Sequence, residues 1–140
     1  MPGLLIIAHT PLASALKAVA EHAYPECSGM IEALDVAPAD PIESLELRAQ
    51  AMLLRVKDPD ALVLTDVVGA TPCNLAQRLA DGRHVRVIAG VNVPMVWRAL
   101  CYAREPLESV ADRAMTGATQ GVVQVTAAEP QRSALNAATP

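Results

Sequence analysis

The sequence predicts an α/β protein in which helices cover both faces of a mainly parallel sheet. Short apolar runs alternate with amphipathic segments along the chain, which is the pattern of repeated strand–helix units. The run at residues 61–65 is apolar almost throughout, as expected for a strand that is buried on both faces. Because 140 residues suffice for a domain with a sizeable core, we expect a single domain over residues 1–126.

The first half of the chain predicts two strands, each followed by a helix. Residues 4–8 form the first strand and residues 31–36 the second. The first helix begins near Pro11, and its apolar residues share one helical face: Leu12, Leu16, Val19, Ala20 and Ala23. The second helix continues to residue 56 and begins with a favourable N-cap at Asp40, followed by Pro41 and, three residues after the cap, Glu43.

The second half predicts further strands at residues 61–65 and 85–89. Thr71 is the expected N-cap of a helix that begins at Pro72 and ends near residue 80, before Asp81 and Gly82. Two more helices are expected at residues 94–103 and 107–115, the latter followed by Gly117. Residues 121–126 alternate in the way of an edge strand, whereas residues 127–140 carry no pattern and are expected to be disordered.

These elements predict a flavodoxin-like, doubly wound sheet. Crossover connections between parallel strands are right-handed in nearly all proteins, so few arrangements are available. In the flavodoxin-like order the first strand lies beside the third, and ligands bind at the carboxyl ends of these strands. His9 ends the first strand and Asp66 follows the third. We therefore expect the two side chains to be neighbours.

Composition excludes several classes of protein. The net charge of -4 argues against nucleic acid as a partner, because phosphate binding needs a basic patch. No apolar stretch is long enough to insert into a membrane, and the N-terminus lacks the features of a signal peptide. The three cysteines lie far apart without a metal-binding spacing, which indicates reduced thiols in a cytoplasmic protein that holds no metal and no cofactor. Core packing is the expected role of Cys73.

His9 has the surroundings of a nucleophile. A carboxylate that accepts the Nδ1 proton fixes the tautomer and leaves Nε2 with a lone pair, and Asp66 is placed for this role. A plainer alternative is that Asp66 only caps its own loop through an Asx-turn. Gly69, Ala70 and Thr71 lead into a helix N-terminus, where free N–H groups can bind an anion. The combination predicts phosphoryl transfer through a phosphohistidine, and the absence of a P-loop argues against a bound nucleotide.

The chain resembles the IIA domain of the mannose-type (mannose/fructose/sorbose) phosphoenolpyruvate-dependent phosphotransferase system. Three segments carry the resemblance: residues 3–9 (GLLIIAH), residues 66–74 (DVVGATPCN) and residues 88–95 (IAGVNVPM). The resemblance as a whole extends over roughly residues 3–126, which is nearly the whole chain.

The resemblance implies a function for each part of the site. His9 would be the phosphoacceptor, taking phosphate on Nε2 from phospho-HPr and passing it to a IIB protein. Asp66 would contact the Nδ1 atom of His9 and orient the ring. Thr10, Asn92 and Pro94 would form the wall of the site, although Asn92 and Pro94 also suit a simple helix start. The family forms homodimers that exchange a final strand, which here would be residues 121–126.

This sequence departs from the family pattern beside the proposed site. Thr10 follows the histidine where the family often has glycine, and Val67 and Val68 stand where the family often has threonine and tryptophan. These changes, with no IIB domain after residue 126, leave a regulatory alternative open, in which phosphorylation of His9 controls a partner without sugar transport. A third alternative, a flavodoxin-like binder of a small ligand, is disfavoured because no aromatic residue lies near His9 in the sequence to stack a flavin.

Overall fold

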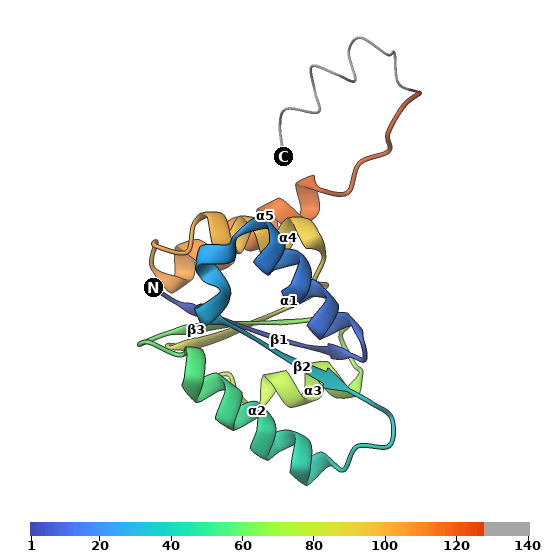
Figure 1. Cartoon of the computed structure of the whole chain (residues 1–140), viewed down its shortest axis with the longest axis vertical. Helices are drawn as coiled ribbons and strands as arrows, with labels where there is room; N and C mark the ends of the chain where they lie inside the picture. Colours follow the sequence, from blue (N-terminus) through green and yellow to red (C-terminus); the bar gives the residue numbers. More distant parts are fainter. Residues whose placement is uncertain (128–140) are drawn as a thin grey trace.

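The computed structural model describes residues 1–127 and has a four-stranded parallel sheet at its centre (Figure 1). The strands are β1 (Gly3–His9), β2 (Ile31–Val36), β3 (Ala61–Thr65) and β4 (Val85–Ala89). Their order is β2-β1-β3-β4, and every neighbouring pair is parallel. The strand order reverses between β1 and β3, so the predicted flavodoxin-like sheet is confirmed.

Helices cover both faces of this sheet, as Figure 1 shows. One face carries α1 (Leu12–Ala23), α4 (Val93–Cys101) and α5 (Leu107–Gln120). The other face carries α2 (Ile42–Val56) and α3 (Thr71–Gln77). A short 3₁₀ helix, η1 (Pro25–Met30), joins α1 to β2. None of the helices within residues 1–127 is both long and apolar enough to cross a bilayer.

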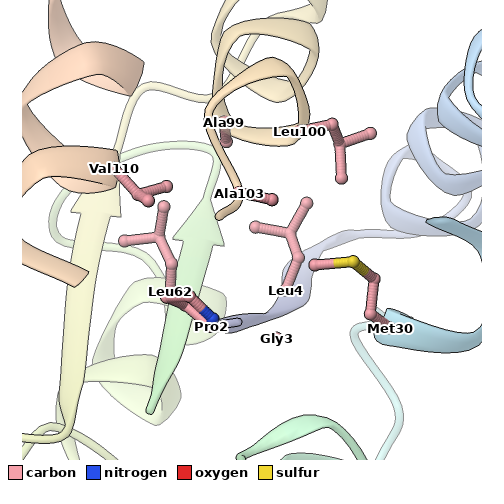
Figure 2. Close-up of a pocket in the computed structure, with 9 residues that line it drawn as sticks. All are labelled: Pro2, Gly3, Leu4, Met30, Leu62, Ala99, Leu100, Ala103 and Val110. Atoms are coloured by element: carbon pink, nitrogen blue, oxygen red, sulfur yellow. The ribbon is translucent and has the colours of Figure 1, made fainter. Parts of the chain in front are cut away.

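The core consists of two apolar clusters, one on each face of the sheet. Alternate residues of a strand point to opposite faces, so Leu4 and Ile6 of β1 join the cluster under α1, α4 and α5, whereas Leu5 and Ile7 join the cluster under α2. Packing is close, because the hollow lined by Leu4, Leu62, Leu100 and Val110 has a volume of only about 10 Å³. Figure 2 draws the side chains around it. A hollow of this size holds no ligand larger than one water molecule.

Several predicted helix ends need correction. Asp40 does not cap α2, because its carboxylate accepts the Ala37 N–H at 3.0 Å, and Pro41 takes the N-cap position. Thr71 is the first residue of α3, and Ala70 is its N-cap. Helix α3 ends at Gln77 rather than near residue 80, because Arg78 and Leu79 donate to carbonyls three residues back, which tightens the last turn.

The helices α4 and α5 also differ from the prediction. Helix α4 ends at Cys101 rather than at residue 103, and a turn follows it. Helix α5 continues through Gly117 to Gln120. A Cβ atom at residue 117 would lie 2.7 Å from Arg98 Cβ, so Gly117 is a close packing point between the two helices. A glycine with this role does not end a helix.

Residues 121–126 do not form the predicted edge strand of the chain's own sheet. They follow α5 as an exposed segment without regular structure, and β4 has no neighbour on its outer side among residues 1–127. A strand needs a partner strand for its backbone hydrogen bonds, and α5 carries this segment away from β4. The predicted disordered tail lies, apart from Ala127, outside the described residues.

Candidate functional site

The carboxyl ends of β1 and β3 bring His9 and Asp66 into contact. His9 is the last residue of β1, and Asp66 follows directly after β3, its neighbour in the sheet. The Nδ1 atom of His9 lies 2.6 Å from Oδ2 of Asp66. The backbone N–H of His9 donates to the same oxygen at 3.0 Å. Two contacts to one carboxylate oxygen hold the ring and its strand end in a single arrangement.

The two side chains differ in exposure, which suits them to different roles. Half of the His9 side chain is exposed (50%), whereas only 13% of the Asp66 side chain is exposed. Partial burial raises the pKa of Asp66, but hydrogen bonds from the His9 backbone, the His9 ring and the Val67 N–H outweigh it, so the net pKa is lowered. Asp66 is therefore ionised at neutral pH and can only accept hydrogen bonds.

An ionised Asp66 determines which nitrogen of His9 is available. Because a carboxylate accepts, the Nδ1 atom beside it carries the proton, and Nε2 keeps the lone pair. This tautomer is assigned from the hydrogen-bond geometry. Asp66 also accepts the Val67 N–H through Oδ1 at 2.9 Å. That bond comes from the next residue, whereas an Asx-turn uses the N–H two residues on, so the described bonds of Asp66 support the contact with His9 and not the predicted Asx-turn.

The loop from Gly69 to Thr71 leads from Asp66 into α3. Gly69 has a φ of 90°, a conformation that glycine adopts most readily, and nothing lies within 4 Å of where its Cβ would be. Ala70 is extended and its carbonyl accepts the first helical bond, from Asn74. The Thr71 side chain is exposed and does not cap the helix. Its hydroxyl is therefore available to another group.

The other predicted wall residues have structural partners. Asn92 caps α4 by accepting the Met95 N–H at 2.9 Å, and its amide donates to the Ala118 carbonyl at 3.3 Å. Pro94 packs closely against Gly121 at the end of α5. The helix-start role of Asn92 is thus confirmed, and both side chains hold α4 to α5. Thr10, directly after His9, is exposed and donates its N–H to the Val36 carbonyl at 3.0 Å.

One supporting residue, Gly90, was missed from the sequence. Its N–H donates to the Asp66 carbonyl at 3.0 Å, and the next N–H, of Val91, donates to the Thr65 carbonyl at 3.0 Å. Gly90 adopts a φ of 91°, which a residue with a side chain rarely adopts. This turn holds the backbone of Asp66 in place. A glycine directly after a predicted strand was the available signal.

A second histidine–aspartate pair lies at the opposite edge of the sheet. Nδ1 of His84, just before β4, is 2.7 Å from Oδ1 of Asp60, just before β3. The ring contact has the same geometry as at His9, but residue 84 is followed by a strand and has no loop like that of Gly69 to Thr71. His84 is a natural control for His9.

Residues 1–127 contain no group of three histidine, cysteine or acidic side chains that could hold a metal ion. Cys73 is buried, which agrees with the predicted packing role.

The family described as PTS system fructose IIA component (EIIA-man) matches residues 3–115. The chain belongs to this family. The match includes His9, Asp66 and the loop that follows, and it makes the protein a IIA component of a phosphotransferase system. No curated protein sequence matches this IIA chain significantly.

Three of the solved structures with a similar fold are described as IIA proteins or components of phosphotransferase systems. The mannose/sorbose specific IIA subunit from Enterococcus faecalis is 23% identical, with a TM-score of 0.80 over 91% of this chain and 97% of that one. Component EIIA from Streptococcus agalactiae is 20% identical, with a TM-score of 0.77 over 89% and 97%. The IIA protein associated with the fucose utilization operon of Streptococcus pneumoniae is 21% identical, with a TM-score of 0.77 over 88% and 92%. At these identities the likeness shows the fold.

Proposed function

We propose that this IIA protein is a cytoplasmic phosphoryl carrier that accepts phosphate on His9 Nε2 from phospho-HPr and passes it to a IIB component. The observation that carries the proposal is the 2.6 Å contact between His9 Nδ1 and the Asp66 carboxylate. This contact gives His9 the tautomer that a nucleophilic Nε2 requires. Membership of the IIA family supports the same conclusion.

The transfer needs one bond to form and one to break. The lone pair of His9 Nε2 attacks the phosphorus atom, the P–N bond of the donor phosphohistidine breaks, and its electron pair returns to the donor imidazole. The His9 ring then keeps its Nδ1 proton and gains positive character, which the ionised Asp66 stabilises at 2.6 Å. The N–H groups of Gly69, Ala70 and Thr71 and the Thr71 hydroxyl are the proposed donors to the phosphoryl oxygens.

Labelling with phosphoenolpyruvate, enzyme I and HPr tests the proposal. We expect an acid-labile phosphate on the wild-type protein and none on His9→Ala. The control is His84→Ala, which removes the ring of the other pair and should leave the label unchanged. An unlabelled wild type, or a label that persists in His9→Ala, would contradict the assignment of His9.

The regulatory alternative is favoured by one observation. Val67 and Val68, which replace polar and aromatic residues common in the family, are both exposed, Val68 by 74%. They change the surface that an acceptor protein would meet. Incubating the phosphorylated protein with IIB components separates the alternatives: transfer to IIB supports the carrier, whereas a stable phosphoprotein that binds another target supports regulation.

A further inference from the structure

The three aromatic side chains of this protein lie close together, away from His9. The sequence contains one tryptophan, two tyrosines and no phenylalanine. Trp97 of α4 and Tyr24, which follows α1, line one hollow, and Tyr102 lines a second hollow that shares Tyr24 with the first. The helices α1 and α4 lie on the same face of the sheet (Figure 1). Both begin after the carboxyl end of a strand, so their last residues lie toward the edge opposite His9.

The first of these, here called the Trp97 hollow, has the size of a small-molecule site. Its volume is about 390 Å³, and its lining residues are Tyr24, Pro94, Trp97, Arg98 and Cys101. Ligand pockets commonly occupy roughly 300–1,000 Å³ and combine apolar and aromatic walls with a few polar groups. Two aromatic rings and a proline give this hollow flat apolar walls. It therefore suits a ligand with a flat apolar body.

Two polar groups of the Trp97 hollow are hydrogen-bond donors without a protein partner. The Arg98 guanidinium offers N–H donors and no acceptor, and it takes part in none of the ion pairs within residues 1–127. The indole N–H of Trp97 is buried and has no acceptor in the same part of the chain. Leaving a buried donor unpaired is unfavourable. A ligand that supplies acceptors would therefore be stabilised here.

Tyr24 adds a third donor to the hollow. Burial raises the pKa of Tyr24, and the nearby Cys101, Cys27 and Glu26 raise it further, so its hydroxyl keeps its proton at neutral pH. No carboxylate lines the Trp97 hollow, whereas Glu26 lines the neighbouring one. One unpaired arginine favours an anionic group, and the carboxylate of Glu26 disfavours a second negative charge.

We infer that the Trp97 hollow binds a small aromatic carboxylate. The carboxylate accepts hydrogen bonds from Arg98, and the flat body of the ligand packs against the rings of Trp97 and Tyr24. A phosphate group, which carries more charge, is disfavoured by Glu26. The site goes beyond the phosphoryl transfer proposed for His9 and requires neither a phosphate nor a donor protein.

Tryptophan fluorescence tests the site directly, because Trp97 is the only tryptophan in the chain. We expect benzoate to change this fluorescence saturably, with a Kd of about 1 mM or lower. Benzamide has the same flat ring without the charge and should bind about tenfold more weakly. Free N-acetyltryptophanamide in the same solutions measures collisional quenching. Saturation-transfer nuclear magnetic resonance detects bound benzoate independently of fluorescence. No saturable binding by either method would overturn the inference.

Arg98→Gln tests the proposed contact with the carboxylate. Glutamine keeps the Cβ and Cγ atoms that pack against Gly117 and removes the positive charge. We expect benzoate to bind this variant about tenfold more weakly, since hydrogen bonds to charged groups are the stronger ones. The matched control is Arg48→Gln, which removes the same charge from α2 on the other face of the sheet and should keep the wild-type affinity.

Two outcomes would contradict the chemistry assigned to the ligand. Equal affinities of wild type and Arg98→Gln for benzoate, with both chains folded by circular dichroism, would exclude Arg98 as the carboxylate partner. Equal affinities of the wild-type protein for benzoate and benzamide would show that the hollow binds flat rings without regard to charge.

Discussion

At the scale of single residues, the distinguishing feature is a carboxylate that serves two groups of His9. Oδ2 of Asp66 contacts both the ring Nδ1 and the backbone N–H, at 2.6 Å and 3.0 Å. His84 divides these two contacts between two carboxylates, since its ring contacts Asp60 at 2.7 Å and its backbone N–H donates to Asp81 at 2.7 Å. Asp66 therefore fixes the ring relative to the strand that carries it.

Asp66→Ala removes this restraint while leaving His9 in place. We expect the single-turnover rate of His9 phosphorylation to fall roughly 10- to 100-fold, the usual effect of losing a group that orients a histidine. Far-ultraviolet circular dichroism should show that the fold persists. The control is Asp60→Ala, which removes the corresponding carboxylate from His84 and should leave the rate unchanged. An unaltered rate in Asp66→Ala would exclude the orienting role.

The lowered pKa of Asp66 also predicts how stability depends on pH. A carboxyl group whose pKa is lower in the folded than in the unfolded chain stabilises the fold above its unfolded pKa, about 3.9 for aspartate. This stabilisation is lost as the pH falls through the folded pKa. We therefore expect urea unfolding to show a larger advantage of wild type over Asp66→Ala at pH 7 than at pH 3.

The comparison with Asp66→Ala isolates one carboxylate among several. Asp81, whose pKa is lowered to about 2 by the N–H groups of Arg83, Val85 and His84, also loses its charge at low pH. It is present in both chains, so its contribution cancels in the difference. A stability difference that stays constant between pH 7 and pH 3 would be inconsistent with the lowered pKa of Asp66.

At the scale of elements, close packing of β1 against α2 depends on a missing side chain. Gly3 begins β1, and a Cβ atom there would lie 1.9 Å from the carbonyl oxygen of Val56, the last residue of α2. This neighbour is backbone, so it cannot rotate away. Either the strand or the helix end would have to move.

Gly3→Ala should accordingly lower the free energy of unfolding by about 1–3 kcal/mol, the usual cost of inserting a group into a packed core. Gly29→Ala is the control, because no atom lies within 4 Å of where its Cβ would be. Urea unfolding of both variants measures the difference. Equal stabilities of the two variants would show that the α2 end moves at little cost.

The sequence predicted the sheet well and the helix ends less well, for a physical reason. The central strands β1 and β3 are apolar runs buried on both faces, so local composition determines them. Gly117, by contrast, looks like the end of α5 in the sequence, yet it lies inside the helix because Arg98 packs against it. Asp40 looks like a cap for α2, yet it binds the Ala37 N–H. The end of α5 and the start of α2 thus depend on contacts that a local sequence pattern does not reveal.

The candidate site was predictable where topology alone decides it. His9 and Asp66 each follow a parallel strand, and adjacent strands bring them together without any further information. The supporting turn at Gly90 was missed, because its role comes from hydrogen bonds to residues 65 and 66 in another part of the chain.

At the scale of the whole molecule, residues 1–127 leave the outer side of β4 unpaired and end in an exposed apolar segment. Residues 1–127 place no strand on the outer side of β4. After α5, Val122, Val123 and Val125 are 78%, 68% and 85% exposed. The open edge offers unpaired backbone N–H and C=O groups, and valine is a residue that favours β-strands, so the two are suited to pair.

In a homodimer, residues 121–126 of each chain could pair with the sheet of the other chain. This exchange would give the open edge a neighbouring strand and would bury the exposed valines. We expect the wild-type protein to sediment as a dimer in analytical ultracentrifugation and a chain that ends at Gln120 to sediment as a monomer. A chain that ends at Ala127 keeps the segment and should remain dimeric. The same mass for all three chains would contradict the exchange. Phosphoramidate should still label the chain that ends at Gln120, because β1 and β3 position His9 and Asp66 within one chain.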